Sequence, residues 1–331
     1  MRVFDLHCDT LDALGTADLH EPGDGSPRES VGDIVTNGLD LAADRMHAAA
    51  PEGWCQCYAV FVPDGMDPAR LSALDFYRHV SAYLRAQTAE HADKVAQPHD
   101  ARDIEGVLAA GKVCALLTIE NGAPVESLEV LDQMAADGVK MITLTWNGKN
   151  QIASGNVTTD GMSDFGREVV RHMEELGIVV DVSHLNDAGF ADLLKVATRP
   201  FAASHSNSRA VCGHKRNLTD DQFRAIVERG GIVGINYWTE MVSERCWGHE
   251  ADVDPSFDEL SAHIEHFLDL GGEKAVALGS DYDGSHVPTW LKGCQTLPAF
   301  YARVVARFGQ ELADDMFYGN AHRFFVANEE R

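Results

Sequence analysis

The chain begins with two potential metal ligands at the end of an apolar run. In the opening sequence MRVFDLHCDT, residues 3–6 are followed by His7 and Asp9. Side chains two residues apart in a strand point to the same side, so these two converge if the run is a strand. Imidazole and carboxylate groups are zinc ligands. A single histidine and aspartate at this spacing are more often a hydrogen-bonded histidine beside a solvated aspartate. The metal interpretation therefore needs further ligands elsewhere.

Further histidines and carboxylates stand at the ends of other short apolar runs. The endings TIEN, DVSH, SHS and SDYD supply Glu120, His184, His205, Asp281 and Asp283. A buried histidine that makes one hydrogen bond explains any single one of them. Because all of them stand at the same place in their runs, the sequence predicts that they form one metal centre.

These endings belong to a regular alternation of apolar runs and helical segments. The predicted strands cover residues 2–7, 55–63, 113–121, 140–147, 177–184, 201–206, 230–238 and 275–283. Helical spacing is found over 72–90, 103–111, 126–138, 163–177, 218–231 and 254–272. Eight strands alternating with helices predict an α/β fold, a (β/α)8 TIM barrel. Such barrels carry their reacting groups at the C-terminal ends of the strands, where the endings above lie.

No break in composition marks a linker, so residues 1–331 are predicted to form one domain. Residues 8–54 are expected to hold a loop over one barrel end and then a helix near 38–50. Additional helices after residue 296 are expected to pack outside the barrel. A doubly wound open sheet is the alternative fold, and the lack of G-x-G-x-x-G after the first strand weakens it.

One catalytic zinc ion uses three protein ligands and a water, and the predicted centre has more ligands than this. Two zinc ions about 3.5–4 Å apart would use them all and share a hydroxide. Glu120 is the expected bridge because it lies between the His7 side and the His184 side. Asp281 is the expected general base, and Asp5 is expected to orient His7. Asp283 is expected either to share the role of Asp281 or to make loop hydrogen bonds. Lys140 opens its strand and is expected at the opposite end of the barrel, so it is rejected as a carbamylated bridge.

Charge and cysteine content restrict the partners. The net charge is −25, which disfavours nucleic acid and anionic membranes. No apolar run is long enough to span a membrane, and no signal peptide is visible, so a cytoplasmic protein is expected. The seven scattered cysteines indicate reduced thiols, and Cys55 and Cys57 are expected in the core. Within this acidic chain Arg209, Lys215 and Arg216 form a basic cluster, which suggests an anionic substrate.

The motifs DLHCDT, TIENG, VDVSH, ASHSNSRAVCGHKRN and GSDYDG occur in this order over the whole chain. With them the chain resembles the membrane (renal) dipeptidase family of the metal-dependent amidohydrolase superfamily. The resemblance implies two zinc ions, hydrolysis of dipeptides often with a D-residue at the C-terminal position, and a homodimer. It assigns His7 and Asp9 to one zinc, His184 and His205 to the other, Glu120 to both, Asp281 to proton transfer and Arg216 to the substrate carboxylate.

Two positions depart from this family. Trp146 in LTWNGKN stands where the mammalian enzymes have a histidine thought to stabilise the oxyanion. Because a tryptophan has a single N–H donor and no charge, Asn147 or Asn150 is the alternative donor. A substrate-contacting tyrosine aligns with Met241, with Tyr237 and Trp238 nearby.

The sequence therefore predicts a cytoplasmic dizinc dipeptidase. An N-acyl-D-amino-acid deacylase is the alternative within the same superfamily. A protein that keeps the metal site without turnover is the alternative outside catalysis, because Trp146 replaces the family histidine.

Overall fold

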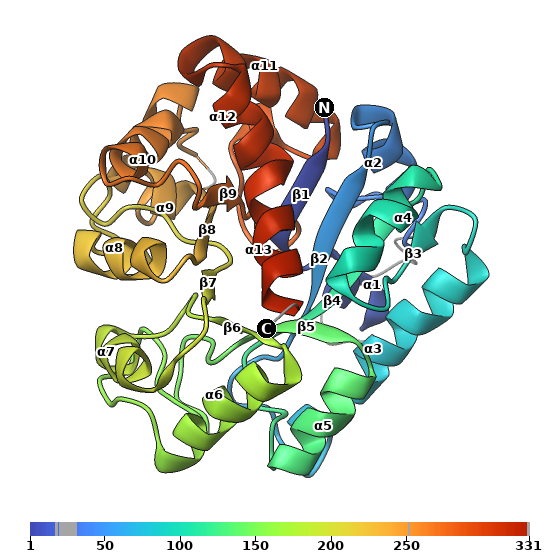
Figure 1. The fold of residues 1–331 in the computed structure, drawn as a ribbon, viewed down its shortest axis with the longest axis vertical. Coiled ribbons are helices and arrows are strands. Elements are labelled where there is room, and N and C mark those ends of the chain that lie inside the picture. Colours follow the sequence, from blue (N-terminus) through green and yellow to red (C-terminus); the bar gives the residue numbers. More distant parts are fainter. Residues whose placement is uncertain (17–18, 20–31, 251, 330–331) are drawn as a thin grey trace.

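A closed parallel barrel forms the centre of the molecule (Figure 1). The computed structural model describes residues 1–16, 19, 32–250 and 252–329. Its strands are β1 (Val3–Cys8), β2 (Trp54–Phe61), β3 (Val95–Ala96), β4 (Val113–Glu120), β5 (Val139–Thr143), β6 (Val179–Asp181), β7 (Ala202–Ala203), β8 (Ile232–Ile235) and β9 (Val276–Leu278). The order is β2-β1-β9-β8-β7-β6-β5-β4-β3, and the additional pairing of β2 with β4 closes the barrel. The predicted (β/α)8 barrel is confirmed, and the open doubly wound sheet is excluded.

The eight barrel strands are those predicted, and β3 is an addition. Its two residues pair with Val113 and Cys114 outside the closed ring. Two residues are too few to show a periodic pattern, which explains why the sequence did not reveal this strand.

Helices surround the barrel (Figure 1). They are α1 (Thr10–Gly15), α2 (Ala43–Ala49), α3 (Ala73–Glu90), α4 (Ile104–Ala109), α5 (Leu128–Ala136), α6 (Asp164–Leu176), α7 (Asp187–Val196), α8 (Asp220–Glu228), α9 (Thr239–Val242), α10 (Phe257–Asp269), α11 (Leu297–Phe308), α12 (Gln310–Asp314) and α13 (Asn320–Glu329). All six predicted helices are present, as is the helix expected near 38–50, whereas α1, α7 and α9 were not predicted. Residues 17–18 and 20–31 of the expected loop lie outside the described residues.

The C-terminal tail is helical, as expected, and α13 closes the N-terminal end of the barrel. Phe324 and Phe325 pack in one buried cluster with Phe4 and with residues from the beginnings of the other strands. The side chain of Lys140 lies at this end, with Nζ 2.6 Å from Oε1 of Glu329 on α13. Lys140 is therefore far from the C-terminal ends of the strands, as predicted. The tail thus closes the N-terminal end of the barrel, and the predicted reacting groups lie at the opposite end.

The cysteines and helices of the described residues agree with two further expectations. All seven cysteines are free and buried, including Cys55 and Cys57 in the barrel interior. Across residues 1–16, 19, 32–250 and 252–329, no helix combines the length and apolarity that crossing a bilayer requires.

A buried histidine on α10 joins two loops that border the C-terminal mouth. Nδ1 of His263 accepts the Ser208 N–H at 3.1 Å, and Nε2 donates to the carbonyl of Val242 at 2.9 Å. Burial, with a smaller contribution from nearby His266, lowers the pKa of His263 to about 4. The imidazole is therefore neutral in the folded chain down to acidic pH.

This histidine is expected to make folding acid-sensitive. Between pH 7.5 and 4.5 it should lower the free energy of unfolding by about 2–3 kcal/mol, because the unfolded histidine binds a proton near pH 6.5 and the folded one only near pH 4. The variant His263→Gln keeps one acceptor and one donor and should lack this contribution. Denaturant unfolding of both proteins at the two pH values measures the difference, and an equal loss in both would contradict the prediction.

Candidate metal centre

The predicted ligands meet at the C-terminal mouth of the barrel. His7 lies on β1 and Glu120 is the last residue of β4, while His184 and His205 follow β6 and β7. Asp9 directly follows β1. All five side chains are buried, although each of them is polar or ionisable. Their assembly from four strands confirms the predicted convergence.

The backbone at this mouth is unusually strained. Among the described residues, the non-glycine residues with positive φ are Asn121 (76°), His184 (68°), Asp281 (62°) and Asp283 (65°). All four follow barrel strands. Left-handed backbone costs energy for residues with a Cβ and persists where the surrounding structure enforces it, which is typical of functional sites.

The two oxygens of Glu120 face different histidines. Oε2 lies 3.5 Å from Nε2 of His7, and Oε1 lies 2.7 Å from Nε2 of His184 and 3.7 Å from Nε2 of His205. Asp9 Oδ2 lies 3.4 Å from the same His7 nitrogen. A carboxylate placed between two sets of ligands is suited to bridge two cations.

Two of the imidazoles face each other through their Nε2 atoms. Nε2 of His184 and Nε2 of His205 are 3.0 Å apart. Nδ1 of His184 contacts Oδ1 of Asn147 at 3.2 Å, and this oxygen can only accept. Nδ1 of His205 contacts the hydroxyl of Ser204 at 2.7 Å, and that hydroxyl in turn contacts Asp181. If both Nδ1 atoms donate, both Nε2 atoms carry lone pairs that face each other and Glu120.

The electrostatics of the centre agree with a cation site. Burial lowers the pKa of His184 and of His205 well below the ordinary value, so both rings are neutral. The ring of His7 behaves differently: burial lowers its pKa, but Asp9 and Glu120 outweigh burial and raise it to about 10. His7 Nε2 and Asp9 Oδ1 are buried without a hydrogen-bond partner in the described chain. Carboxylates that favour a positive charge at His7, with neutral imidazoles beside them, fit metal ions, and His7, Glu120 and His205 can reach one ion together.

Asp281 and Asp283 have different surroundings. Asp281 Oδ1 lies 3.8 Å from Nε2 of His7, and its Oδ2 accepts from the Asn236 amide at 3.0 Å. Burial raises the pKa of Asp281 to about 6. Asp283 accepts from the hydroxyl of Thr10 at 2.5 Å and the N–H of Asp40 at 2.7 Å. Of the two carboxylates, Asp283 makes the loop hydrogen bonds and Asp281 faces the ligand cluster.

The expectation that Asp5 orients His7 is wrong. Its carboxylate accepts the backbone N–H of Ser280 at 2.9 Å, the Ser280 hydroxyl at 2.5 Å and the Gln56 amide at 3.1 Å. Sharing a strand face with His7 therefore does not give a contact with its ring, because neighbouring strands supply closer donors.

A glycine permits the close approach of the acidic residues. A Cβ on Gly284 would lie 1.9 Å from Oδ2 of Asp9 and 2.7 Å from Oδ1 of Asp281. The last residue of the GSDYDG motif thus makes room for both carboxylates, a role that sequence analysis missed.

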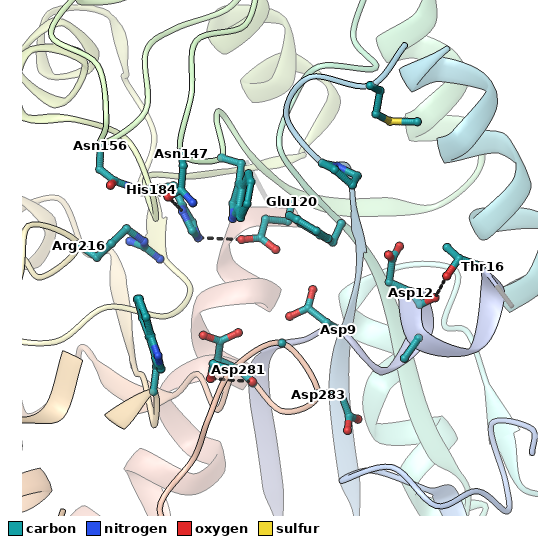
Figure 2. A pocket seen from close by; sticks show the side chains of 18 of the residues that line it. Asp9, Asp12, Thr16, Glu120, Asn147, Asn156, His184, Arg216, Asp281 and Asp283 are labelled. Atoms are coloured by element: carbon teal, nitrogen blue, oxygen red, sulfur yellow. Dashed lines mark hydrogen bonds and ion pairs between the residues drawn. The ribbon is translucent and has the colours of Figure 1, made fainter. Parts of the chain in front are cut away.

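A cavity of about 940 Å³ opens above the ligand cluster. Figure 2 shows Arg216 and Asn156 on one side of Glu120, and Asp12 of α1 with Thr16 just after this helix on the other. Apolar residues of β2 and the loop after it, including Phe61, also line the cavity. The cavity is large enough for a small peptide whose middle lies over the ligands.

The basic cluster divides into a structural and a cavity-facing part. Arg209 pairs with Asp187 at 2.9 Å, so it is engaged in the fold. Arg216 is buried and lines the cavity, and its guanidinium makes no ion pair with the described residues. Its one hydrogen bond there is a long contact of 3.4 Å to the carbonyl of His205. Burial lowers the pKa of Arg216 to about 10, although the carboxylates of Glu120, Asp281 and Asp181 favour its charged form. Arg216 therefore remains charged without a direct ion pair among the described residues.

The other predicted substrate residues are placed unequally. Trp146 and Asn147 line the cavity, and the Trp146 ring packs edge-on against Phe61 with ring centroids 4.9 Å apart. Asn147 contacts His184 and thus orients a candidate ligand. The Asn150 amide donates to Asn121 and to the carbonyl of Leu144, and its oxygen accepts from the backbone that follows. It is therefore not available as an oxyanion donor.

Met241 is not supported as a substrate contact. Its side chain is fully buried, and its carbonyl accepts from Asn217 at 2.9 Å. Trp238, from the same loop, lines the cavity instead. Met241 was named by alignment with the family, and alignment does not fix the register of an irregular loop, which explains the difference.

Comparison with known proteins identifies the family. A model of the membrane dipeptidase family, peptidase family M19, matches residues 1–330. An uncharacterized protein in the pqqA 5′ region of Klebsiella pneumoniae is 33% identical over 250 residues, covering 72% of this chain and 91% of that protein. An uncharacterized dipeptidase of Schizosaccharomyces pombe is 32% identical over 207 residues, covering 60% of this chain and 48% of that protein.

Solved structures share the fold. A metallo peptidase from Rhodobacter sphaeroides, solved with a phosphinate mimic of the dipeptide L-Ala-D-Ala, has a TM-score of 0.84 at 23% identity, covering 98% of this chain and 99% of that one. The probable dipeptidase PvdM from Pseudomonas aeruginosa has a TM-score of 0.83 at 19% identity, covering 100% of this chain and 96% of that one. Because the family model spans nearly every residue, this chain belongs to the membrane dipeptidase family, peptidase family M19, and is a hydrolase of the metallo-dipeptidase type.

Proposed function

We propose that the chain is a binuclear zinc dipeptidase that cleaves dipeptides with a free C-terminal carboxylate, including those with a D-residue at that position. The observation that carries this proposal is the buried guanidinium of Arg216, which lines the same cavity as Glu120 and His184 and makes no direct ion pair with the described residues. A buried cation without a directly bonded carboxylate is costly, so a substrate carboxylate would relieve this cost on binding. The dipeptide mimic bound to the R. sphaeroides relative supports a substrate of this size and stereochemistry.

The candidate ligands divide between two cations. His7 and Asp9 would hold one zinc ion, His184 and His205 would hold the other, and Glu120 would contact both through its separate oxygens. When bound, the two ions supply an acidified water as nucleophile and polarise the scissile carbonyl. Arg216 would hold the C-terminal carboxylate, so the peptide bond lies over the ligands. The N-terminal side chain then faces Phe61 and Trp146.

Asp281 is proposed to transfer the proton from the attacking water to the leaving amine. Oδ2 is fixed by Asn236, which leaves Oδ1 directed at the cluster. Because His7, Asp9 and Asp281 could also hold an ion together, a ligand role is the competing explanation.

The variant Asp281→Asn separates these two roles. As a proton carrier, Asp281 is needed for turnover but not for binding metal, so the variant should retain two zinc ions per chain while kcat falls roughly 10²–10⁴-fold. Metal analysis and steady-state kinetics on the same preparation measure both. Loss of one zinc together with activity would show that Asp281 is a ligand.

A deacylase of N-acyl-D-amino acids is the alternative activity, because its substrates also carry a free carboxylate. The two differ at the other end of the substrate, where a dipeptide has an amino group and an acyl amino acid has none. A panel of L-Xaa-D-Ala dipeptides and matching N-acyl-D-alanines, assayed with zinc present, should give higher kcat/KM for the dipeptides. Higher values for the acyl compounds would favour the deacylase, and zinc binding without hydrolysis of either would indicate a binding protein.

We further propose a reducing compartment such as the cytoplasm, which the free and buried state of all seven cysteines supports. The homodimer that the family resemblance implies stays a prediction.

A further inference from the structure

The barrel interior contains two Asp–Ser pairs with the same hydrogen-bond pattern. In the first, Asp181 accepts the backbone N–H of Ser204 at 2.8 Å through Oδ1 and the Ser204 hydroxyl at 2.6 Å through Oδ2. In the second, Asp5 accepts the N–H of Ser280 at 2.9 Å and the Ser280 hydroxyl at 2.5 Å in the same way. All four residues are buried. Each serine directly precedes a residue of the site, His205 or Asp281.

The two pairs differ in what the serine touches next. The Ser204 hydroxyl lies 2.7 Å from Nδ1 of His205, a candidate zinc ligand. The Ser280 hydroxyl lies 3.1 Å from the backbone carbonyl of His7 and makes no contact with a ligand imidazole. One serine therefore contacts the ring of a candidate ligand, whereas the other contacts only backbone groups besides its aspartate.

The direction of the Ser204 hydroxyl proton determines which nitrogen of the His205 ring carries a proton. A hydroxyl has one proton, and Ser204 donates it in a hydrogen bond to Oδ2 of Asp181, 2.6 Å away. The other possible acceptor, the Ser183 hydroxyl, is farther away at 3.2 Å and already receives the N–H of His205 at 3.1 Å. Since Ser204 spends its proton on Asp181, it can only accept from His205. Nδ1 must then carry the ring proton, and Nε2 keeps its lone pair toward Glu120 and His184.

Asp181 is held as an acceptor by its own surroundings. Besides the two donors from Ser204, it receives the N–H of Ser183 at 3.0 Å and the hydroxyl of Thr143 at 2.6 Å. An ionised carboxylate accepts all four, two on each oxygen. The donors come from strands or strand ends on both sides of β6, so the carboxylate cannot rotate without breaking several bonds.

We propose that Asp181 and Ser204 are positioning residues that fix His205 as the tautomer with its proton on Nδ1, so that Nε2 is always available to the metal. Partners behind a ligand histidine usually contact it directly, and here a serine carries the effect of the carboxylate. The inference rests on the proposed function, because it requires that His205 binds zinc.

The variant Asp181→Asn tests the inference without a change of shape. The asparagine oxygen can keep the two backbone N–H groups, and its NH₂ then faces the hydroxyls of Thr143 and Ser204. Both hydroxyls would accept from this NH₂, which turns the Ser204 proton toward His205. The ring proton would then move to Nε2, where a zinc ion cannot bind.

Two measurements on the full chain give the result. In ¹⁵N-histidine-labelled, zinc-free protein, the His205 nitrogens, assigned by their absence from His205→Gln, should show the Nδ1–H tautomer in wild type and the Nε2–H tautomer in Asp181→Asn. Competition with a chelator should show a zinc dissociation constant roughly 10–100-fold higher for the more weakened site. Activity is not needed for either readout.

The second pair supplies matched controls. Asp5→Asn makes the same exchange in the pair of Asp5 and Ser280, so it should leave the His205 tautomer and the zinc affinity as in wild type. Ser204→Ala should weaken zinc binding and Ser280→Ala should not, which keeps the test available if Asp181→Asn does not fold. Equal effects of the two Asp→Asn variants, or an unchanged tautomer in Asp181→Asn, would overturn the inference. Failure of the wild type to bind zinc would instead refute the proposed function.

Discussion

The variant His205→Ala is expected to bind fewer than two zinc ions per chain and to lose dipeptide hydrolysis by at least about 10³-fold. The ring of His205 is buried, 3.0 Å from His184 Nε2 and 3.7 Å from Glu120 Oε1, so its removal takes away one of the converging ligand nitrogens. The same outcome is expected for His184→Ala, whose ring contacts Glu120 at 2.7 Å. Metal analysis of the purified variants, together with kcat/KM for one dipeptide, measures both effects.

A surface histidine offers the matched control. His99, Asp100 and Asp103 form another group whose atoms could hold an ion, and the His99 side chain is 93% exposed. His99→Ala should keep two zinc ions and full activity. If His205→Ala and His184→Ala both kept two zinc ions while His99→Ala lost one, the ion would lie on the surface and the ligand assignment would be wrong.

Removing the guanidinium of Arg216 should damage catalysis selectively. Arg216→Ala is expected to lower kcat/KM by about 100-fold for dipeptides with a free carboxylate, because charged hydrogen bonds contribute about 1.5–3 kcal/mol each. For the corresponding dipeptide amides the difference between variant and wild type should be small. Zinc content should stay at two per chain, because a guanidinium carries only hydrogen-bond donors and no lone pair for a metal ion.

The comparison of acid and amide substrates makes this prediction specific. A general disturbance of the cavity would lower both rates equally, and such a result would count against the carboxylate clamp. Arg216→Lys keeps the charge but loses the forked donors, so its activity should lie between wild type and alanine.

Much of the fold was predictable because parallel strands buried on both faces leave a strong signal. The runs ending in His7, Glu120 and His184 are apolar and β-branched, and the helices between them have clear capping residues. Ser163, for example, accepts from the N–H of Gly166, and Gly177 ends the same helix at a φ of 73°. The rule that barrel chemistry lies at the C-terminal strand ends then placed the ligands together.

The contacts behind the ligands were not predictable, because they depend on which residues lie opposite one another in neighbouring strands. Asp181 meets Ser204 only because β6 pairs with β7 at Asp181 and Ala202. Asp5 shares a face with His7, but its donors come from Gln56 on β2 and from Ser280, which is 275 residues away in sequence. Spacing along one strand cannot show a partner on the next.

Irregular segments account for the remaining differences. Met241 was expected at the substrate and is buried, while Trp238 faces the cavity, because the loop after β8 forms the short helix α9. Asn147 also contacts His184 through its Oδ1, a contact that the sequence did not reveal. No periodic pattern encodes these positions.

Titration of the chelated, zinc-free chain with zinc, monitored by hydrolysis of an L-Xaa-D-Ala dipeptide, is the most direct test of the metal centre. Because the ligands at the barrel mouth divide into two sets around Glu120, hydrolysis should be absent without metal and should reach its maximum at two zinc ions per chain. Full hydrolysis by the metal-free chain, or a maximum already reached at one ion, would contradict the binuclear centre.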